Sequence, residues 1–160
     1  MSLKESSVGI GRLLRKEFVL EQLQAKDKQE VLAELAGALA RGRTKEDLGA
    51  MVRVLREREK LGSTGIGGGV AIPHGKLPGL GEIMVAFGRS REGVEFDAVD
   101  GKPVHLFFLL MAPENSAGEH LKVLAKLSRM LKDGQFRKRL LEAPLHEDLV
   151  RLLAEKGDEG

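Results

Sequence analysis

The sequence of 160 residues contains no cysteine, tryptophan or tyrosine, and it has only six phenylalanines. The lack of cysteine excludes disulfides and thiolate metal sites. The shortage of aromatic side chains argues against a protein that stacks nucleic-acid bases. Long apolar runs are also missing. The longest extends from Leu106 to Ala112, far below the roughly 20 residues of a membrane-spanning helix, so we predict no direct insertion into a membrane.

Charge of one sign does not dominate either, because 26 Lys and Arg face 24 Asp and Glu, for a net charge of +2. The two signs are interspersed along the chain. We therefore predict no nucleic-acid partner, although the pI is near 8.9. The N-terminal sequence MSLKESSVGIGRLL holds no apolar stretch of signal-peptide length. These absences favour a cytoplasmic location, and the length fits one domain with a sizeable core.

Helices are predicted where apolar residues recur with a period of 3.6 and where capping signals precede them. Asp27 with Glu30, and Ser116 with Glu119, have capping-box spacing, and Thr44 is a third N-cap. The inner faces of these three helices are expected at Val31, Leu32, Leu35, Ala36 and Leu39; at Leu48, Met51, Val52 and Leu55; and at Leu121, Leu124, Leu127 and Leu131. Two further helices are expected at 136–141 and 145–153, on either side of Pro144.

Short apolar segments between these helices are strand candidates. They lie at 18–23, 70–72, 83–88 and 104–111. The last is apolar at almost every position, which is typical of a central strand with both faces covered. Helices interleaved with such strands predict an α/β fold, a single domain with helices on both faces of one sheet.

The segment from Ser63 to Pro73 is the most unusual, because Gly65, Gly67 and two further glycines fall within five residues. Each glycine costs conformational entropy, so the cluster needs a reason. Backbone N–H groups could approach an anion closely, or the loop tip could need positive φ, and the pattern leaves both open. The spacing fits neither a P-loop nor a dinucleotide-binding fingerprint.

The glycine loop leads into A-I-P-H-G-K, which contains His74. Pro73 stiffens the chain before the histidine, and Gly75 leaves the imidazole uncrowded. An uncharged imidazole carries a lone pair, so His74 is a candidate nucleophile. The alternative is an ordinary surface or capping histidine, and the flanking residues favour the nucleophile.

Phosphoryl transfer between imidazoles needs in-line positioning and groups that stabilise the charge on the moving phosphoryl. Arg58 could bind two phosphate oxygens, or it could be a solvated helix charge. His120 lies at the apolar edge of its helix, either beside His74 or as a packed core histidine. Ser63 and Thr64 offer hydroxyls. The remaining histidines, His105 and His146, are expected to be structural, and no histidine pair has metal-ligand spacing, so no metal is predicted.

Residues 58–77, with the sequence R-E-K-L-G-S-T-G-I-G-G-G-V-A-I-P-H-G-K-L, resemble the active-site signature of the fructose/mannitol-type enzyme IIA proteins of the phosphoenolpyruvate-dependent phosphotransferase system. F-D-A-V-D-G-K-P-V at 96–104 and the segments L-F-F-L-L-M-A-P and E-H-L-K-V-L-A-K-L-S extend the resemblance. It covers residues 8–155, leaving tails at 1–7 and 156–160. The nearest likeness is to the stand-alone, nitrogen-regulatory branch. Gly68 is a departure, since that position often carries Asn or Asp.

This resemblance implies a mixed sheet of about five strands. It also implies that His74 is phosphorylated on Nε2 by HPr or a nitrogen-type HPr homologue, without a cofactor, and that the recipient is a IIB domain or a regulated protein. Arg58 matches the family's phosphate-stabilising arginine, and His120 matches its second active-site histidine. Ser63, Thr64, Gly65 and Gly67 are the expected phosphate-binding loop.

The short tail leaves no room for a IIB domain or a permease, which favours a regulatory role. Two alternatives stay open. One is a IIA subunit that serves a separate sugar transporter, and the other is a binding module on the same fold that no longer transfers phosphate.

Overall fold

The central element of the computed structural model, which describes residues 9–158, is a strand of ten residues, β6 (Val104–Pro113). β6 pairs in antiparallel fashion with β5 on one side. On its other side it pairs in parallel with two short strands in succession, β3 and β4. The sheet order is β1-β5-β6-β3-β2, with β4 added beside β6. The strands other than β6 are β1 (Val19–Leu20), β2 (Gly65–Gly67), β3 (Val70–Ala71), β4 (His74–Leu77) and β5 (Met84–Val94).

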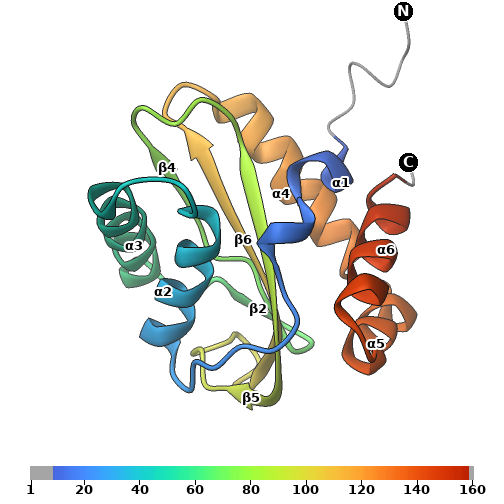
Figure 1. The fold of residues 1–160 in the computed structure, drawn as a ribbon. Helices are drawn as coiled ribbons and strands as arrows, with labels where there is room; N and C mark the ends of the chain where they lie inside the picture. The colour runs from blue at the N-terminus through green and yellow to red at the C-terminus, as the bar shows by residue number, and fades with distance from the viewer. Residues whose placement is uncertain (1–8, 159–160) are drawn as a thin grey trace, which may run out of the picture.

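Helices cover both faces of this mixed sheet, as the sequence predicts. In Figure 1, α2 and α3 lie on one side of the sheet, and α4, α5 and α6 lie on the other. The helices are α1 (Ile10–Leu13), the 3₁₀ helix η2 (Lys16–Phe18), α2 (Lys28–Leu39), α3 (Lys45–Lys60), α4 (Ala117–Met130), α5 (Gly134–Glu142) and α6 (His146–Gly157).

The alternation of side chains along β6 explains the two layers of helices. Leu106, Phe108 and Leu110 pack into the cluster that includes α4, α5 and α6. Phe107 and Leu109 pack into the cluster formed with α2 and α3. All five are at most 1% exposed. Since successive side chains of a strand point to opposite faces, a continuous apolar run needs cover on both, and the predicted central strand is confirmed.

The predicted N-caps of α2 and α3 are confirmed. Asp27 accepts a hydrogen bond from the Glu30 N–H at 2.8 Å, although the Glu30 carboxylate reaches back to the Lys26 N–H instead of closing the box. Thr44 and Asp47 form a complete capping box at the start of α3. These caps satisfy donors that the first helical turn leaves unpaired.

α4 follows the prediction except near its start. Ser116 is the N-cap residue but makes no side-chain cap bond, because its hydroxyl donates to the Pro113 carbonyl at 2.6 Å. Of the predicted inner positions, Leu127 and Leu131 are buried and Leu124 packs against the core, but Leu121 is 66% exposed. A histidine, His120, and not a leucine, therefore points inward near the start of the helix.

The sheet has six strands instead of about five, and some bounds differ. β2 and β4 were not among the expected strands. The candidate at 18–23 shortens to Val19–Leu20, because η2 takes its first residue. The strand expected at 83–88 instead continues to Val94. Both β2 and β4 contain glycine, and they form strands because β3 and β6 supply backbone partners, which local propensity does not reveal.

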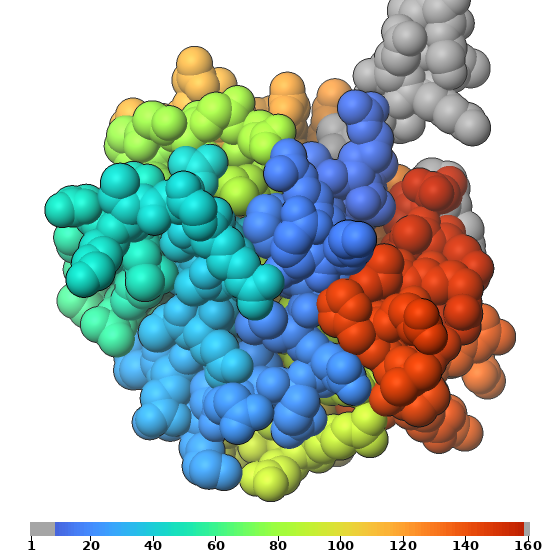
Figure 2. All heavy atoms as spheres, in the orientation of Figure 1, coloured from blue at the N-terminus to red at the C-terminus, as the bar shows by residue number. Residues whose placement is uncertain are grey.

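The described N-terminal segment ties the two layers together. In Figure 2 it lies, in blue, between the α2/α3 side and the α5/α6 side. The His146 Nε2 donates to the Lys16 carbonyl at 3.0 Å and to the Val19 carbonyl at 3.1 Å, which joins α6 to this segment.

His105 is also bonded to the backbone, since its Nδ1 donates to the Ser90 carbonyl at 2.9 Å. Both His146 and His105 therefore have the structural roles that were expected. α6 continues to Gly157, beyond the expected end of the domain at residue 155; the expected tail 1–7 lies outside the described residues.

The approach of α3 to β4 is close at one point. A Cβ atom added to Gly75 would lie 2.4 Å from the Cγ1 atom of Val54. Val54 belongs to α3 and is β-branched, so its side chain has few rotamers into which it can retreat. The glycine therefore allows the helix to lie directly against the strand.

We expect Gly75→Ala to lower the free energy of unfolding by about 1–3 kcal/mol through overpacking. Urea denaturation followed by circular dichroism measures this. Gly75→Ala combined with Val54→Ala should recover most of the loss. Gly81→Ala is the matched control, because a Cβ at Gly81 would meet nothing within 4 Å. Equal stability of Gly75→Ala and the unmodified chain would contradict the packing described here.

Candidate active site

His74 is the first residue of β4, and a break in the strand sets its position. β3 ends at Ala71, and Ile72 and Pro73 separate it from β4. The Pro73 carbonyl accepts a hydrogen bond from the Leu110 N–H at 2.9 Å, and His74 lies in register with Leu110. The chain thus stays paired to β6 on both sides of the break, which fixes the backbone of the histidine, while its side chain remains half-buried.

The hydrogen bonds of the His74 ring distinguish its two nitrogens. Nδ1 lies 2.8 Å from the Ile72 carbonyl oxygen. A carbonyl only accepts, so Nδ1 carries the proton. Nε2 lies 3.3 Å from the Nε of Arg58, whose N–H can only donate. The uncharged ring therefore has its lone pair on Nε2.

Arg58 comes from the last turn of α3 and is held at two points. Besides the contact of its Nε with His74, its Nη1 donates to the Gly62 carbonyl at 2.9 Å. That carbonyl belongs to the turn that ends the helix, so the guanidinium is anchored beside the ring. No described residue bonds its second amino group, Nη2. This group is available to an acceptor that approaches His74.

His120 reaches the same place from α4, on the opposite layer. Its ring centroid is 5.5 Å from that of His74, with the ring planes at 71°. His120 is only 7% exposed, and its buried Nε2 has no hydrogen-bond partner among the described residues. Buried polar atoms are nearly always paired, so this nitrogen calls for an explanation.

The surroundings of the two rings favour their uncharged forms. Burial, followed by the positive charge of Arg58, lowers the pKa of His74, although the Ile72 carbonyl and the Glu59 carboxylate act in the opposite direction. Burial also lowers the pKa of His120, with further lowering from His74 and Lys76. A pKa below the usual value keeps both imidazoles uncharged at neutral pH. Nε2 of His74 then carries an unprotonated lone pair.

The donors of the expected phosphate-binding loop are engaged within the protein. The Ser63 hydroxyl donates to the Phe96 carbonyl at 2.6 Å and accepts from the Gly65 N–H at 3.0 Å. The Thr64 N–H and hydroxyl both donate to the carboxylate of buried Glu59. In this structure these donors do not point at His74, and a phosphate-binding role for them stays a prediction.

The glycines at 67–69 form the tip of the β2–β3 hairpin. Gly67 and Gly68 have φ of 94° and 67°, and Gly69 has φ of 78°. The Gly68 N–H donates to Asp100 at 3.1 Å. The Lys102 N–H, followed by this Gly68 N–H, lowers the pKa of that carboxyl. The tip therefore has the positive φ of the second explanation, and its one N–H bond to an anion is made within the protein; approach of a bound anion stays a prediction.

The hairpin tip and the histidine lie at different places along β6. Val70, next to the tip, is in register with Leu106, whereas His74 is in register with Leu110. Four residues of strand correspond to about 13 Å. A phosphate role for Gly67 would thus have to act from a distance, and it too stays a prediction.

The sequence reasoning missed Glu59. It is 8% exposed and forms an ion pair with Lys28 of α2 at 2.9 Å. The signal was present, because Glu59 follows the buried Met51 and Leu55 at intervals of four residues, which places it on the inner face of α3. A charged residue at an inward-facing helix position indicates a buried partner of opposite charge, which here is Lys28.

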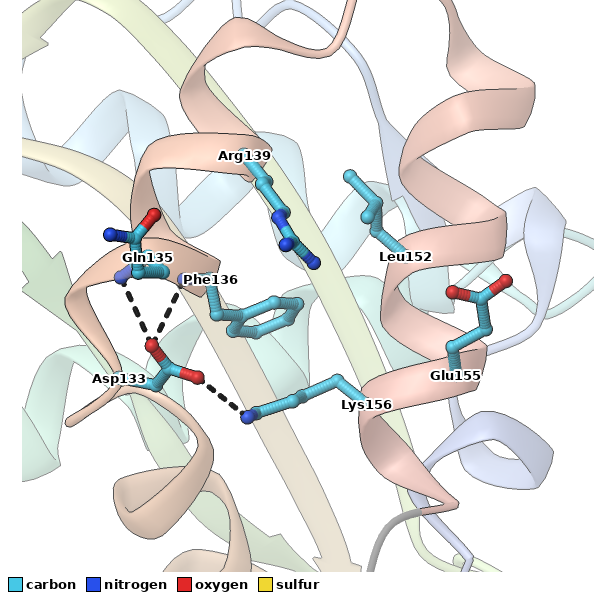
Figure 3. A pocket seen from close by; sticks show the side chains of 7 residues that line it. All are labelled: Asp133, Gln135, Phe136, Arg139, Leu152, Glu155 and Lys156. Atoms are coloured by element: carbon cyan, nitrogen blue, oxygen red, sulfur yellow. Dashed lines mark hydrogen bonds and ion pairs between the residues drawn. The ribbon is translucent and has the colours of Figure 1, made fainter.

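A hollow of about 250 Å³ lies elsewhere, between α5 and α6. Figure 3 shows Arg139 reaching into it, with Phe136 and Leu152 beside it. Asp133 binds Lys156 at 2.8 Å and also caps α5. None of the elements that carry His74, Arg58 and His120 contributes to this hollow, so it is separate from the candidate active site.

Comparison with known families agrees with this geometry. Residues 12–156 match the model of the phosphoenolpyruvate-dependent sugar phosphotransferase system EIIA 2 family. This chain belongs to that family. The EIIA family supplies phosphotransfer components of the system, which is the chemistry that an uncharged, anchored imidazole suits.

Individual relatives place the chain within the family. It is 45% identical over 128 residues to a nitrogen regulatory protein of Bradyrhizobium diazoefficiens, covering 80% of this chain and 83% of that protein. The crystal structure of nitrogen regulatory protein IIA-Ntr from Neisseria meningitidis superposes with a TM-score of 0.83 at 40% identity, covering 90% and 98% of the two chains.

A structure of a IIA–IIB complex is also similar, at lower identity. The Escherichia coli complex of enzyme IIAMTL and phosphorylated enzyme IIBMTL matches with a TM-score of 0.71 at 25% identity, covering 89% and 97% of the two chains. These comparisons show an EIIA protein with nearer likeness to the nitrogen regulatory IIA proteins, and they confirm the resemblance.

Two further observations concern residues 9–158. No helix in this range is long and apolar enough to cross a membrane. No group of three or more His, Asp or Glu side chains gathers there in a way that could hold a metal ion.

Arg58 should control the protonation of His74 in a measurable way. We expect Arg58→Gln to raise the pKa of His74, because a nearby positive charge that disfavours the imidazolium is removed. The pKa should nevertheless stay below the usual value, since burial is the larger cause. Histidine ¹⁵N chemical shifts followed through a pH titration report the pKa and the protonated nitrogen. Arg56→Gln, on the exposed side of the same helix, should change neither, and an unmoved titration in Arg58→Gln would refute the coupling.

Proposed function

We propose that His74 accepts a phosphoryl group on Nε2 from a phosphohistidine of HPr or of a nitrogen-type HPr homologue, and then passes it on. The observation that carries this proposal is the pair of ring contacts: Nδ1–H is held by the Ile72 carbonyl, and Nε2 faces Arg58 at 3.3 Å. Only one nitrogen is left with a lone pair, and it lies beside a guanidinium.

The transfer balances without a cofactor. The Nε2 lone pair forms a bond to phosphorus while the phosphorus–nitrogen bond of the donor breaks, and the donor nitrogen retains that electron pair. His74 keeps its proton on Nδ1 throughout. Because the donor and the acceptor are both imidazoles, positioning and charge stabilisation account for nearly all of the catalysis.

Arg58 and His120 have distinct roles in this proposal. The unbonded Nη2 of Arg58 neutralises charge on the phosphoryl oxygens. The buried Nε2 of His120, which has no partner among the described residues, donates a hydrogen bond to one of those oxygens. A phosphoryl group on His74 would thus satisfy the orphaned nitrogen. Ser63, Thr64, Gly65 and Gly67 would contribute only if their donors exchanged partners.

A protein, and not a small molecule, is the expected phosphoryl donor and recipient. Two exposed apolar side chains adjoin residues of the site in sequence: Leu61 follows the helix of Arg58, and Leu121 follows His120. They are 84% and 66% exposed. Apolar side chains left exposed beside a reactive group suit contact with a protein partner.

We further propose that the protein acts chiefly as a regulator, since its likeness to nitrogen regulatory proteins exceeds its likeness to the mannitol enzyme. Service to a separate sugar transporter is the second candidate, and the mannitol relative, which is solved with a phosphorylated IIB partner, favours it. Transfer of label from the phosphorylated chain to a regulated partner or to a IIB domain decides between them.

The site assignment is tested by phosphoryl labelling. We expect His74→Ala to take up no label from ³²P-labelled HPr, because the only well-placed lone pair is removed. His105→Gln, which alters a structural histidine, should be labelled normally, and circular dichroism confirms that each variant is folded. Undiminished labelling of His74→Ala would exclude His74. Retained partner binding without any transfer in the unmodified protein would instead favour the binding module.

The role of Arg58 is tested by measuring the rate of phosphoryl transfer to His74. We expect Arg58→Lys to slow transfer by about 100-fold, the typical cost of losing one preorganised donor, while His74 remains the labelled residue. Lys keeps the charge but cannot contact His74, Gly62 and a phosphoryl oxygen at once. Rapid-quench kinetics give the rate, and Arg56→Lys is the matched control. Equal rates in the two variants would show that the planar guanidinium is not needed.

A further inference from the structure

A buried ion pair lies behind the active site, and no part of the proposed chemistry uses it. The side chains of Glu59 and Lys28 are 4% and 15% exposed, and their charged atoms are 2.9 Å apart. The Lys28 ammonium also lies 4.7 Å from the centroid of the Phe96 ring and bonds the Phe96 carbonyl at 3.4 Å. Burying two charges is costly, so a pair retained at this depth points to a role.

The Glu59 carboxylate is bonded to more than the lysine. It accepts from the Thr64 N–H at 3.2 Å and from the Thr64 hydroxyl. Thr64 belongs to the turn between α3 and β2, so the carboxylate holds this turn against the end of the helix. Three donors from α2 and the turn therefore meet one buried anion.

A continuous series of hydrogen bonds leads from this anion to the nucleophile. Glu59 accepts from the Thr64 N–H, the Thr64 carbonyl accepts from the Ile72 N–H at 3.0 Å, and the Ile72 carbonyl accepts from the His74 Nδ1–H at 2.8 Å. Thr64 and Ile72 are each bonded at both the N–H and the carbonyl, so the backbone of each residue is held at two points. The peptide that selects the tautomer of His74 is thereby held by the ion pair.

We propose that Glu59 and Lys28 are positioning residues for phosphoryl transfer at His74. The ion pair fixes Thr64, Thr64 fixes the Ile72 peptide, and that peptide orients the ring so that the Nε2 lone pair faces the phosphoryl donor. Neither residue touches the phosphoryl group. The inference rests on the proposed function for its kinetic readout, whereas its spectroscopic readout is independent of any donor.

The charges around His74 give this role a distinct signature. The groups that face the ring are Arg58 and Glu59 from α3 and His120 from α4, with Lys76 of β4 acting on His120. Among the described residues, Glu59 is the carboxylate whose charge opposes the lowering of the His74 pKa. Neutralising Glu59 should therefore lower that pKa further, which a change in packing alone would not do.

The first experiment uses Glu59→Gln, which keeps the size of the side chain and one of the two oxygens that accept from Thr64. We expect the His74 pKa to fall in a histidine ¹⁵N titration. We also expect kcat for transfer from phosphorylated HPr to fall roughly tenfold with KM unchanged, less than the about 100-fold that a 1 Å misplacement can cost. Glu57→Gln is the control, because Glu57 pairs with Lys60 on the exposed side of the same helix. A folded Glu59→Gln variant with an unchanged titration and unchanged kcat would overturn the proposal.

The second experiment separates positioning from stability. Glu59→Gln removes the nearer anion of Lys28 and leaves only the exposed Asp97 carboxylate at 3.5 Å, so we expect it to lower stability. Replacement of a whole buried ion pair is, in contrast, often tolerated. We expect Glu59→Gln combined with Lys28→Met to regain stability while the lowered His74 pKa and the reduced kcat persist. Recovery of the titration, kcat and stability together would show a merely structural role and refute the inference. Failure of the unmodified chain to accept phosphate would count against the proposed function alone, because the titration would still decide this inference.

Discussion

The hydrogen bond from the His74 Nδ1 to the Ile72 carbonyl is the interaction on which the active site depends. It places the ring proton on the nitrogen that points back at the chain and leaves the lone pair on the nitrogen that points at Arg58. The carbonyl is available because the Ile72 backbone faces away from β6. Its N–H donates to the Thr64 carbonyl at 3.0 Å, and the N–H and C=O of one strand residue point to the same side. The register of the strand beside β6 thus determines the chemistry of the histidine.

The rest of the fold brings two further groups to that ring from opposite sides. Arg58 lies near the end of α3 in one layer, and His120 lies near the start of α4 in the other layer. β4, which pairs with β6, carries His74 between them. This convergence needs close contact between α3 and β4, which Gly75 permits, and an α4 whose inward position near its N-terminus is a histidine. Burial from both layers also supplies the largest cause of the lowered pKa of each imidazole. The layered architecture therefore both positions the two rings and keeps them uncharged.

The sequence alone predicts those features that local patterns determine. The central strand follows from an unbroken apolar run, and the starts of α2 and α3 follow from Asp27 and Thr44. The motif around His74 indicates the residues that the structure brings together. Features that depend on distant partners could not be predicted: β4 exists because β6 pairs with it, and the Ser116 hydroxyl prefers the Pro113 carbonyl to its own helix. The hydroxyls of Ser63 and Thr64 looked available for phosphate, but distant acceptors, Phe96 and Glu59, engage them.

Gly68 departs from the family pattern, which often has Asn or Asp at this position, and its surroundings in the structure help to explain the departure. The side chain that Gly68 lacks would enter space beside Arg137, whose guanidinium lies 3.6 Å from the position of an added Cβ. Asp100 already supplies a carboxylate to the hairpin tip through the Gly68 N–H. Asp100, from another segment, thus supplies a polar contact that an Asn or Asp at position 68 could make locally. The space that such a side chain would fill borders Arg137. Since the tip is about 13 Å along β6 from His74, the substitution alters the hairpin and leaves His74, Arg58 and His120 in place.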